Sequence, residues 1–187
     1  TLPHWTANGE QVYLYNGKEV EIINSGLHSL TLPKNETGEK IMYQSGDRIF
    51  VSKSGTRNYT SFAPLVGTEY INTNISPDGL KITFEVFGGN LFVVNADGTN
   101  LVDLGKGNRP QWSLDSKRIV YMIAEDDGYK ITSSDIYSIS SDGSDKIQLT
   151  KSEDISEMNP SWSPDGKNIV FHNLIDGVIY LLPIEIH

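Results

Sequence analysis

The amino-acid sequence predicts an all-β protein built from repeated antiparallel sheets. A turn motif recurs along the chain, apolar residues alternate with polar ones after each turn, and helical periodicity is absent. Alternation with a period of two, bounded by Asp-Gly turns, is typical of antiparallel hairpins. We expect residues 1–187 to form a single domain.

The turn motif is clearest in the stretch WSPDG, which ends at Gly166. Aspartate at such a turn accepts hydrogen bonds from its own main chain, and glycine takes the positive φ that reverses the chain. Proline sets φ within the turn in advance. Further copies are WTANG, NETG, ISPDG and WSLDS, and the residues that define the repeat are Trp5, Gly9, Gly38, Pro77, Asp78, Gly79, Trp112, Asp115, Trp162, Pro164, Asp165 and Gly166.

Two columns of strand-forming residues follow each turn in register. Three residues past the last turn residue stand Val12, Ile41, Ile82, Ile119 and Ile169. Five residues past it stand Leu14, Tyr43, Phe84, Tyr121 and Phe171. Two filled columns in every copy are not expected of unrelated hairpins, so the chain contains a structural repeat.

A second apolar element follows the first hairpin in each of the last four copies. Short apolar stretches begin at Arg48, Asn90, Asp135 and Val178, with a weaker one, KEVEI, at Lys18. The stretches SKSGT, NADGT and SSDGS then form further glycine turns, and 101–104 and 147–150 are expected to be fourth strands. The unit is therefore strand, turn, strand, loop, strand, turn, strand.

The spacing of the repeats predicts a β-propeller of four-stranded antiparallel blades. Successive turns lie 29, 41, 37 and 50 residues apart, which brackets the size of one blade. Such a sheet is unstable alone, so blades pack face to face, and the tryptophan before the turn is suited to wedge between them. We expect about five blades, the first short and the fifth ending after its third strand; the alternative is part of a six-bladed ring.

These motifs resemble the TolB-like β-propeller family, a WD40-like group with PD40 repeats. Its repeat reads roughly Pro-x-Trp-Ser-Pro-Asp-Gly-x-x-Ile-x-Phe, and NPSWSPDGKNIVF matches it almost position for position. RPQWSLDSKRIVY and NISPDGLKITF are close, LPHWTANGEQVYL is degraded, and LPKNETGEKIMY has no tryptophan. The resemblance implies an extracytoplasmic protein, periplasmic, cell-surface or secreted. The family contains binding proteins as well as propeller domains attached to peptidases.

Composition excludes several classes of function. The formal charge of −9 argues against a nucleic-acid partner, which requires a basic footprint. With no cysteine, disulfides, cysteine-zinc sites and thiol catalysis are excluded. The longest apolar stretch, 178–184, contains Pro183 and is too short to span a bilayer, so we expect no membrane insertion.

No enzyme or metal motif stands out. HExxH, Walker-type phosphate-loop and GxSxG patterns are missing, and His4, His28, His172 and His187 share no ligand spacing. We therefore expect no cofactor and no metal. Paired carboxylates could still converge on a central channel from separate blades, as in glycoside hydrolysis, and the nominal candidates are Glu69, Glu85 and Asp176.

Topology separates the two faces of such a molecule. Turns that join strands one to two and three to four lie on one face, here named the turn face. Connections between strands two and three, and between blades, lie on the other, here named the variable-loop face. Variable loops on a rigid scaffold commonly carry recognition.

Two long acidic connections fall on the variable-loop face. They are AEDDGYKITSS, residues 124–134, and KSEDISEMN, residues 151–159, both in or after the fourth blade. The candidate binding residues are Glu125, Asp126, Asp127, Tyr129, Lys130, Glu153, Asp154 and Glu157, together with Arg109 and Asp176. This patch would attract a basic partner surface; the alternative is a pair of solvated loops.

The sequence favours a monomeric, non-enzymatic scaffold that binds a protein or peptide. The alternatives are a glycoside-active propeller enzyme, the accessory propeller of a larger peptidase or hydrolase, and a structural spacer. Whether the chain is an enzyme stays open at this stage, because the repeat motif specifies architecture and not chemistry.

Overall fold

The computed structural model describes residues 40–53 and 58–184 in full and the main chain of residues 4–5, 12–15 and 20–23. Its regular elements are all strands: β1 (His4–Trp5), β2 (Val12–Tyr15), β3 (Val20–Ile23), β4 (Lys40–Ser45), β5 (Arg48–Lys53), β6 (Tyr59–Phe62), β7 (Tyr70–Ile75), β8 (Lys81–Val86), β9 (Leu91–Asn95), β10 (Val102–Gly105), β11 (Asn108–Trp112), β12 (Arg118–Asp126), β13 (Ile131–Ser140), β14 (Ile147–Gln148), β15 (Glu157–Trp162), β16 (Asn168–Asn173) and β17 (Ile179–Pro183). The all-β prediction is confirmed.

The strands form five antiparallel sheets that follow one another along the chain. The sheets β7–β10 and β11–β14 have four strands each, and β1–β3, β4–β6 and β15–β17 have three in the described residues. Strands β10 and β14 confirm the predicted outer strands. Because β4 begins just after Gly38, it corresponds to the second strand of its blade, and the position of the first strand lies outside the described residues.

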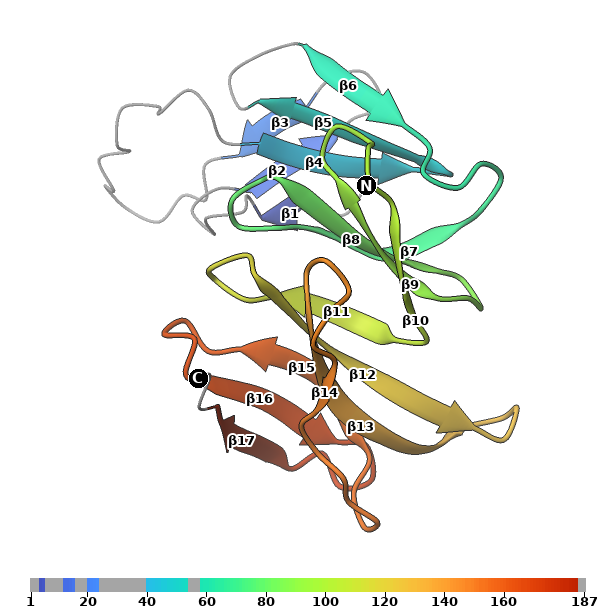
Figure 1. Cartoon of the computed structure of the whole chain (residues 1–187), viewed down its shortest axis with the longest axis vertical. Helices are drawn as coiled ribbons and strands as arrows, with labels where there is room; N and C mark the ends of the chain where they lie inside the picture. The colour runs from blue at the N-terminus through green and yellow to red at the C-terminus, as the bar shows by residue number, and fades with distance from the viewer. Residues whose placement is uncertain (1–3, 6–11, 16–19, 24–39, 54–57, 185–187) are drawn as a thin grey trace.

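Blades two to five pack face to face in chain order, as Figure 1 shows from β4 to β17. Each interface is filled by one apolar cluster. Ile49 and Phe84 belong to the cluster between the second and third sheets. Successive residues of β12 face opposite sides: Tyr121 packs on the third sheet, and Met122 packs towards the fifth. Period-two alternation thus gives one strand two apolar faces, as expected of a blade enclosed on both sides.

The predicted tryptophan wedge is confirmed at two copies. Trp112 is buried between the third and fourth sheets, and its indole Nε1 donates a hydrogen bond of 3.2 Å to the main-chain oxygen of Asn74. Trp162 is half-buried against the cluster between the fourth and fifth sheets. The side chain of Trp5, and residues Gly9 and Gly38, lie outside the described residues.

A serine completes the turn motif. In the fourth blade, Ser113 Oγ donates to Asp115 Oδ1 at 2.6 Å, and Asp115 also accepts the Lys117 main-chain N–H at 3.1 Å. The hydrogen bond from Ser113 is the largest of the causes that lower the pKa of Asp115. The same serine–aspartate pairs occur at Ser76–Asp78 and Ser163–Asp165. The serine two residues before each aspartate is therefore part of the repeat, because its side chain helps to close the turn.

One prediction about the fourth blade is wrong. Residues 124–134 were expected to be a long loop, yet β12 continues to Asp126, β13 begins at Ile131, and Glu125 pairs with Ser133. Only 127–130 form the turn. Continued pairing satisfies main-chain amides that a loop would leave to water. The sequence does not indicate this strand extension, because both of its faces are solvated and its side chains are therefore polar. The result is a hairpin that projects beyond its neighbours (Figure 1).

Candidate functional site

The inner strands of three consecutive blades share a bulge at the same place. Strands β7, β11 and β15 are each first in their sheet, and each shifts register near its start. Asn72, Arg109 and Asn159 lie in these bulges with φ of 50°, 56° and 52°. A positive φ is uncommon for residues other than glycine, and such strain gathers at functional sites. All three stand seven residues before the last residue of their turn motif.

These bulges border a pocket of about 620 Å³ on the inner side of the blades. That volume lies within the range of small-ligand sites. The described lining comes from β4, β7, β11 and β15: Met42, Tyr43, Gln44, Asn72, Thr73, Asn74, Arg109, Gln111, Asn159, Pro160 and Ser161. Two residues after each bulge, a second polar level is formed by Asn74, Gln111 and Ser161. Arg109 is the sole charged residue among these described lining residues.

Glu85 holds two of the bulges together. Its side chain is buried at 2% exposure on β8, where Oε1 accepts hydrogen bonds from Asn72 Nδ2 at 2.7 Å and from the Arg109 main-chain N–H at 2.6 Å. Asn108 Nδ2 donates to Oε2 at 3.2 Å. A buried carboxylate needs such donors. Glu85, nominally a channel acid, is thus a structural clamp between the third and fourth blades.

The other nominal channel acids do not join it. Glu69 is exposed at the end of the connection that precedes β7, and Asp176 lies exposed in the turn between β16 and β17. Asp176 Oδ1 accepts the Val178 main-chain N–H at 2.9 Å, as expected of a turn residue. Within the described part of the chain, no two of these three carboxylates therefore form a catalytic pair in the pocket.

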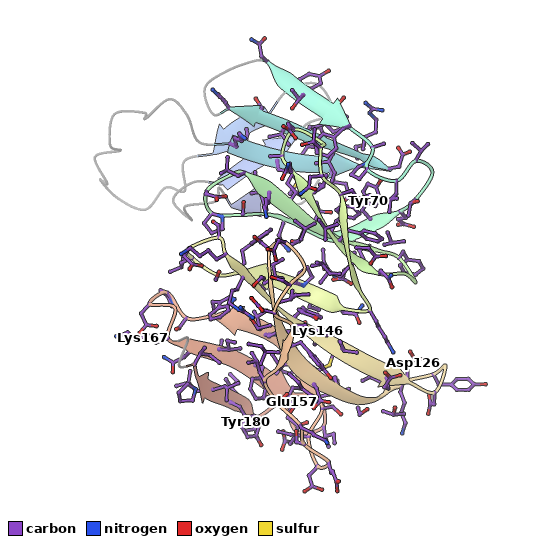
Figure 2. The ribbon with its side chains drawn as sticks, viewed as in Figure 1. Tyr70, Asp126, Lys146, Glu157, Lys167 and Tyr180 are labelled. Atoms are coloured by element: carbon purple, nitrogen blue, oxygen red, sulfur yellow. The ribbon has the colours of Figure 1, made fainter. Side chains whose placement is uncertain are left out.

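The projecting hairpin carries five of the predicted binding residues at or near its tip. Tyr129 is 99% exposed, and Lys130 is exposed beside it. Main-chain N–H groups of Lys130 and then Tyr129 donate to Asp127 and lower the pKa of its carboxyl. Glu125 pairs with Lys106 at 2.9 Å, both exposed. Figure 2 shows Asp126 near the end of this hairpin.

The second acidic connection is divided between surface and interior. Glu153 and Asp154 are exposed as predicted, but Glu157 is completely buried at the start of β15. Its Oε1 accepts a short hydrogen bond from Ser152 Oγ, while Oε2 has no partner in the described residues. Figure 2 shows Glu157 among the side chains of the lower sheets, away from Asp126. Glu157 therefore does not belong to the expected acidic surface.

Large apolar side chains mark the tips of the variable-loop face. Val66, Phe87, Tyr129 and Ile175 are 85%, 70%, 99% and 75% exposed. They lie in the connections β6–β7, β8–β9, β12–β13 and β16–β17 respectively, one for each of blades two to five. In Figure 1 the first three connections all point to the right-hand side. Tyr129 was among the predicted binding residues, whereas the other three were not, because they lie outside the two acidic connections on which that prediction was based.

Metal binding and membrane crossing can be checked on the described residues. Among 40–53 and 58–184, no group of three or more metal-ligating side chains is arranged to hold an ion. No described helix is long and apolar enough to cross a membrane.

Comparison with solved structures identifies the architecture. A structure assigned as TolB from Agrobacterium tumefaciens aligns over 99% of this chain with 19% identity and a TM-score of 0.59. The tricorn protease aligns over 96% with 13% identity and a TM-score of 0.61, and a nidogen/laminin complex over 97% with 13% identity and 0.57. The chain has a TolB-like β-propeller fold.

The propeller spans 61% of the TolB structure, 21% of the tricorn protease chain and 74% of the chain matched in the nidogen/laminin complex. Neither a protein-family model nor a curated protein sequence matches it. At these identities the similarity concerns the fold alone, so function is argued from the site.

Proposed function

We propose that this propeller is a non-enzymatic scaffold that binds a protein or peptide through its variable-loop face. The observation that carries the proposal is the row of exposed apolar tips, Val66, Phe87, Tyr129 and Ile175, on consecutive blades of one face. Single exposed apolar residues are ordinary, but interfaces are enriched in aromatic anchors. Supported by a rigid stack of sheets, these tips can be presented with little loss of entropy on binding.

Charge favours a partner with a basic surface. Glu153, Asp154 and Asp126 are exposed on the same face as the apolar tips, and the whole chain carries a charge of −9. Glu125 is left out of this acidic set because Lys106 neutralises it in an exposed ion pair. Such a field accelerates encounter with a cationic partner and weakens with salt. An extracytoplasmic location is proposed on the TolB-like resemblance alone.

The test is selection of binders from a displayed random-peptide library against the intact chain. Peptides recovered with the wild type are measured against Phe87→Ser/Tyr129→Ser and against a matched control, Leu80→Ser/Leu114→Ser. Leu80 and Leu114 are 58% and 57% exposed but lie in the turns of the opposite face. We expect the first variant to weaken binding at least about tenfold, equal to 1.4 kcal/mol, and the control to leave it unchanged. Equal losses in both variants would refute the assignment of the face.

A further inference from the structure

We propose that the inner pocket binds a carboxylate group of a peptide, with the Arg109 guanidinium as its cationic partner. This inference rests on the proposed function and specifies it further. Arg109 is the second residue of β11, so it lies at the end of the pocket nearer the variable-loop face. A segment held by the apolar tips of that face can therefore reach it.

The guanidinium is available to a ligand. Arg109 is exposed, and Nη1 makes one long hydrogen bond of 3.3 Å to the neutral Asn72 Oδ1. Within the described residues the ion pair found is that of Lys106 with Glu125, so Arg109 has no carboxylate partner there. A guanidinium presents parallel N–H donors in the geometry that a carboxylate accepts.

Its main chain is fixed before any ligand arrives. The Arg109 N–H donates to the buried Glu85 carboxylate, and φ is held at 56° in the bulge. The negative charge of Glu85 is engaged by three N–H donors, none of them from the guanidinium. A cation on a fixed main chain loses less entropy on binding than one on a loop.

The remaining lining suits a peptide main chain. Gln111, Asn159 and Ser161 are exposed to the pocket and make no side-chain hydrogen bond within the described part of the chain. Their amides and hydroxyl can donate to carbonyls and accept from N–H groups. The described lining contains no carboxylate that would repel an acid. Among the described lining residues, the formal charge is therefore the positive charge of Arg109.

Nuclear magnetic resonance titration of the intact ¹⁵N-labelled chain tests the proposal with defined probes. Acetyl-triglycine is compared with its C-terminal amide, and acetyl-Gly-Asp-Gly-amide with the asparagine analogue. We expect a free acid to shift the side-chain signals of Arg109, Gln111 and Asn159, and its uncharged analogue to bind at least about tenfold more weakly. Which of the two acids binds distinguishes a C-terminal carboxylate from a side-chain carboxylate.

Arg109→Gln should abolish the shifts at Gln111 and Asn159. Arg109→Lys should weaken them, because lysine keeps the positive charge but lacks the two parallel N–H donors of the guanidinium. Arg48→Gln is the control, because Arg48 is an exposed arginine on another strand, bonded to Ser61 Oγ at 2.9 Å. Equal binding of acid and amide, or no binding of either acid, would each overturn the proposal. The acid–amide comparison uses wild-type protein, so it does not depend on the folding of a variant.

The two proposals fail in different ways. Displayed-peptide binding that is unchanged in Phe87→Ser/Tyr129→Ser, with the acid titration as expected, would overturn the proposed function and leave carboxylate binding by the pocket in place. Displayed peptides that bind the tips but a pocket that ignores both acids would overturn this inference and leave the proposed function in place.

Discussion

Replacing Glu85 by glutamine should destabilise the propeller more than any exposed charge change. The carboxylate accepts three hydrogen bonds in a buried position between two blades. Hydrogen bonds to a charged group contribute about 1.5–3 kcal/mol each, and neutral ones about 0.5–1.5 kcal/mol. Glutamine keeps one oxygen but places an amide N–H₂ towards a position now reached by the Asn108 amide, so one bond is lost or rearranged and the others weaken. We expect a loss of about 2–4 kcal/mol.

Thermal and urea unfolding followed by circular dichroism measure this loss. A loss of that size should lower Tm by about 10 °C in a chain of this length. Glu69→Gln is the matched control: Glu69 is exposed, and the same substitution there should change stability by less than about 0.5 kcal/mol. If the free energy of unfolding of Glu85→Gln lies within about 0.5 kcal/mol of that of Glu69→Gln, the hydrogen bonds of Glu85 do not stabilise the propeller. A lowered affinity of the pocket for acids should accompany the loss, because the Arg109 bulge depends on the clamp.

Three further outcomes are expected. Gly107→Ala should destabilise by about 1–3 kcal/mol because a Cβ there would lie 2.6 Å from Tyr121 Cδ2, and a urea midpoint equal to the wild type would contradict this overpacking. Trp112→Phe should cost about 1–3 kcal/mol, since its indole N–H bond to the third blade is lost and the space is underfilled; unchanged Tm would refute it. The pKa of Asp115 is lowered in the folded state, so its stabilisation is complete above the unfolded value of 3.8 and is lost as pH falls below it. Ser113→Ala should therefore reduce the decline in Tm measured from pH 5 to pH 3, and an equal decline would exclude the turn as its cause.

Much of the fold could be read from the chain because its causes are local. The Asp-Gly turns reverse the chain through φ and side-chain capping alone, and alternation sets which residues face the neighbouring sheets. In blades three to five the residues of both columns lie in the interface clusters: Ile82 and Phe84, Ile119 and Tyr121, and Ile169 and Phe171. The hairpin at 124–134 was misjudged because its pairing depends on main-chain partners that leave little pattern in exposed side chains.

The candidate site was only partly predictable. Arg109 was selected, but Asn72 and Asn159 were not, although their spacing of seven residues before each turn was present in the sequence. Charge alone suggested that Glu157 was a surface acid, whereas packing buries it entirely. The exposed apolar tips Phe87 and Ile175 look in sequence like ordinary strand residues, since exposure is decided by which sheets cover them.

The sequence by itself determined the repeat, the turns, the order of strands within a blade and the division into two faces, since each follows from contacts between residues near one another in the chain. Only the tertiary structure decided the bulges, the Glu85 clamp and the lack of a carboxylate partner for the Arg109 guanidinium within the described residues. These features join residues that are distant in the chain: Asn72 with Glu85 within the third blade, and Glu85 with Arg109 of the fourth blade. Burial and charge compensation at such junctions arise only when the sheets are stacked, and no local pattern records them.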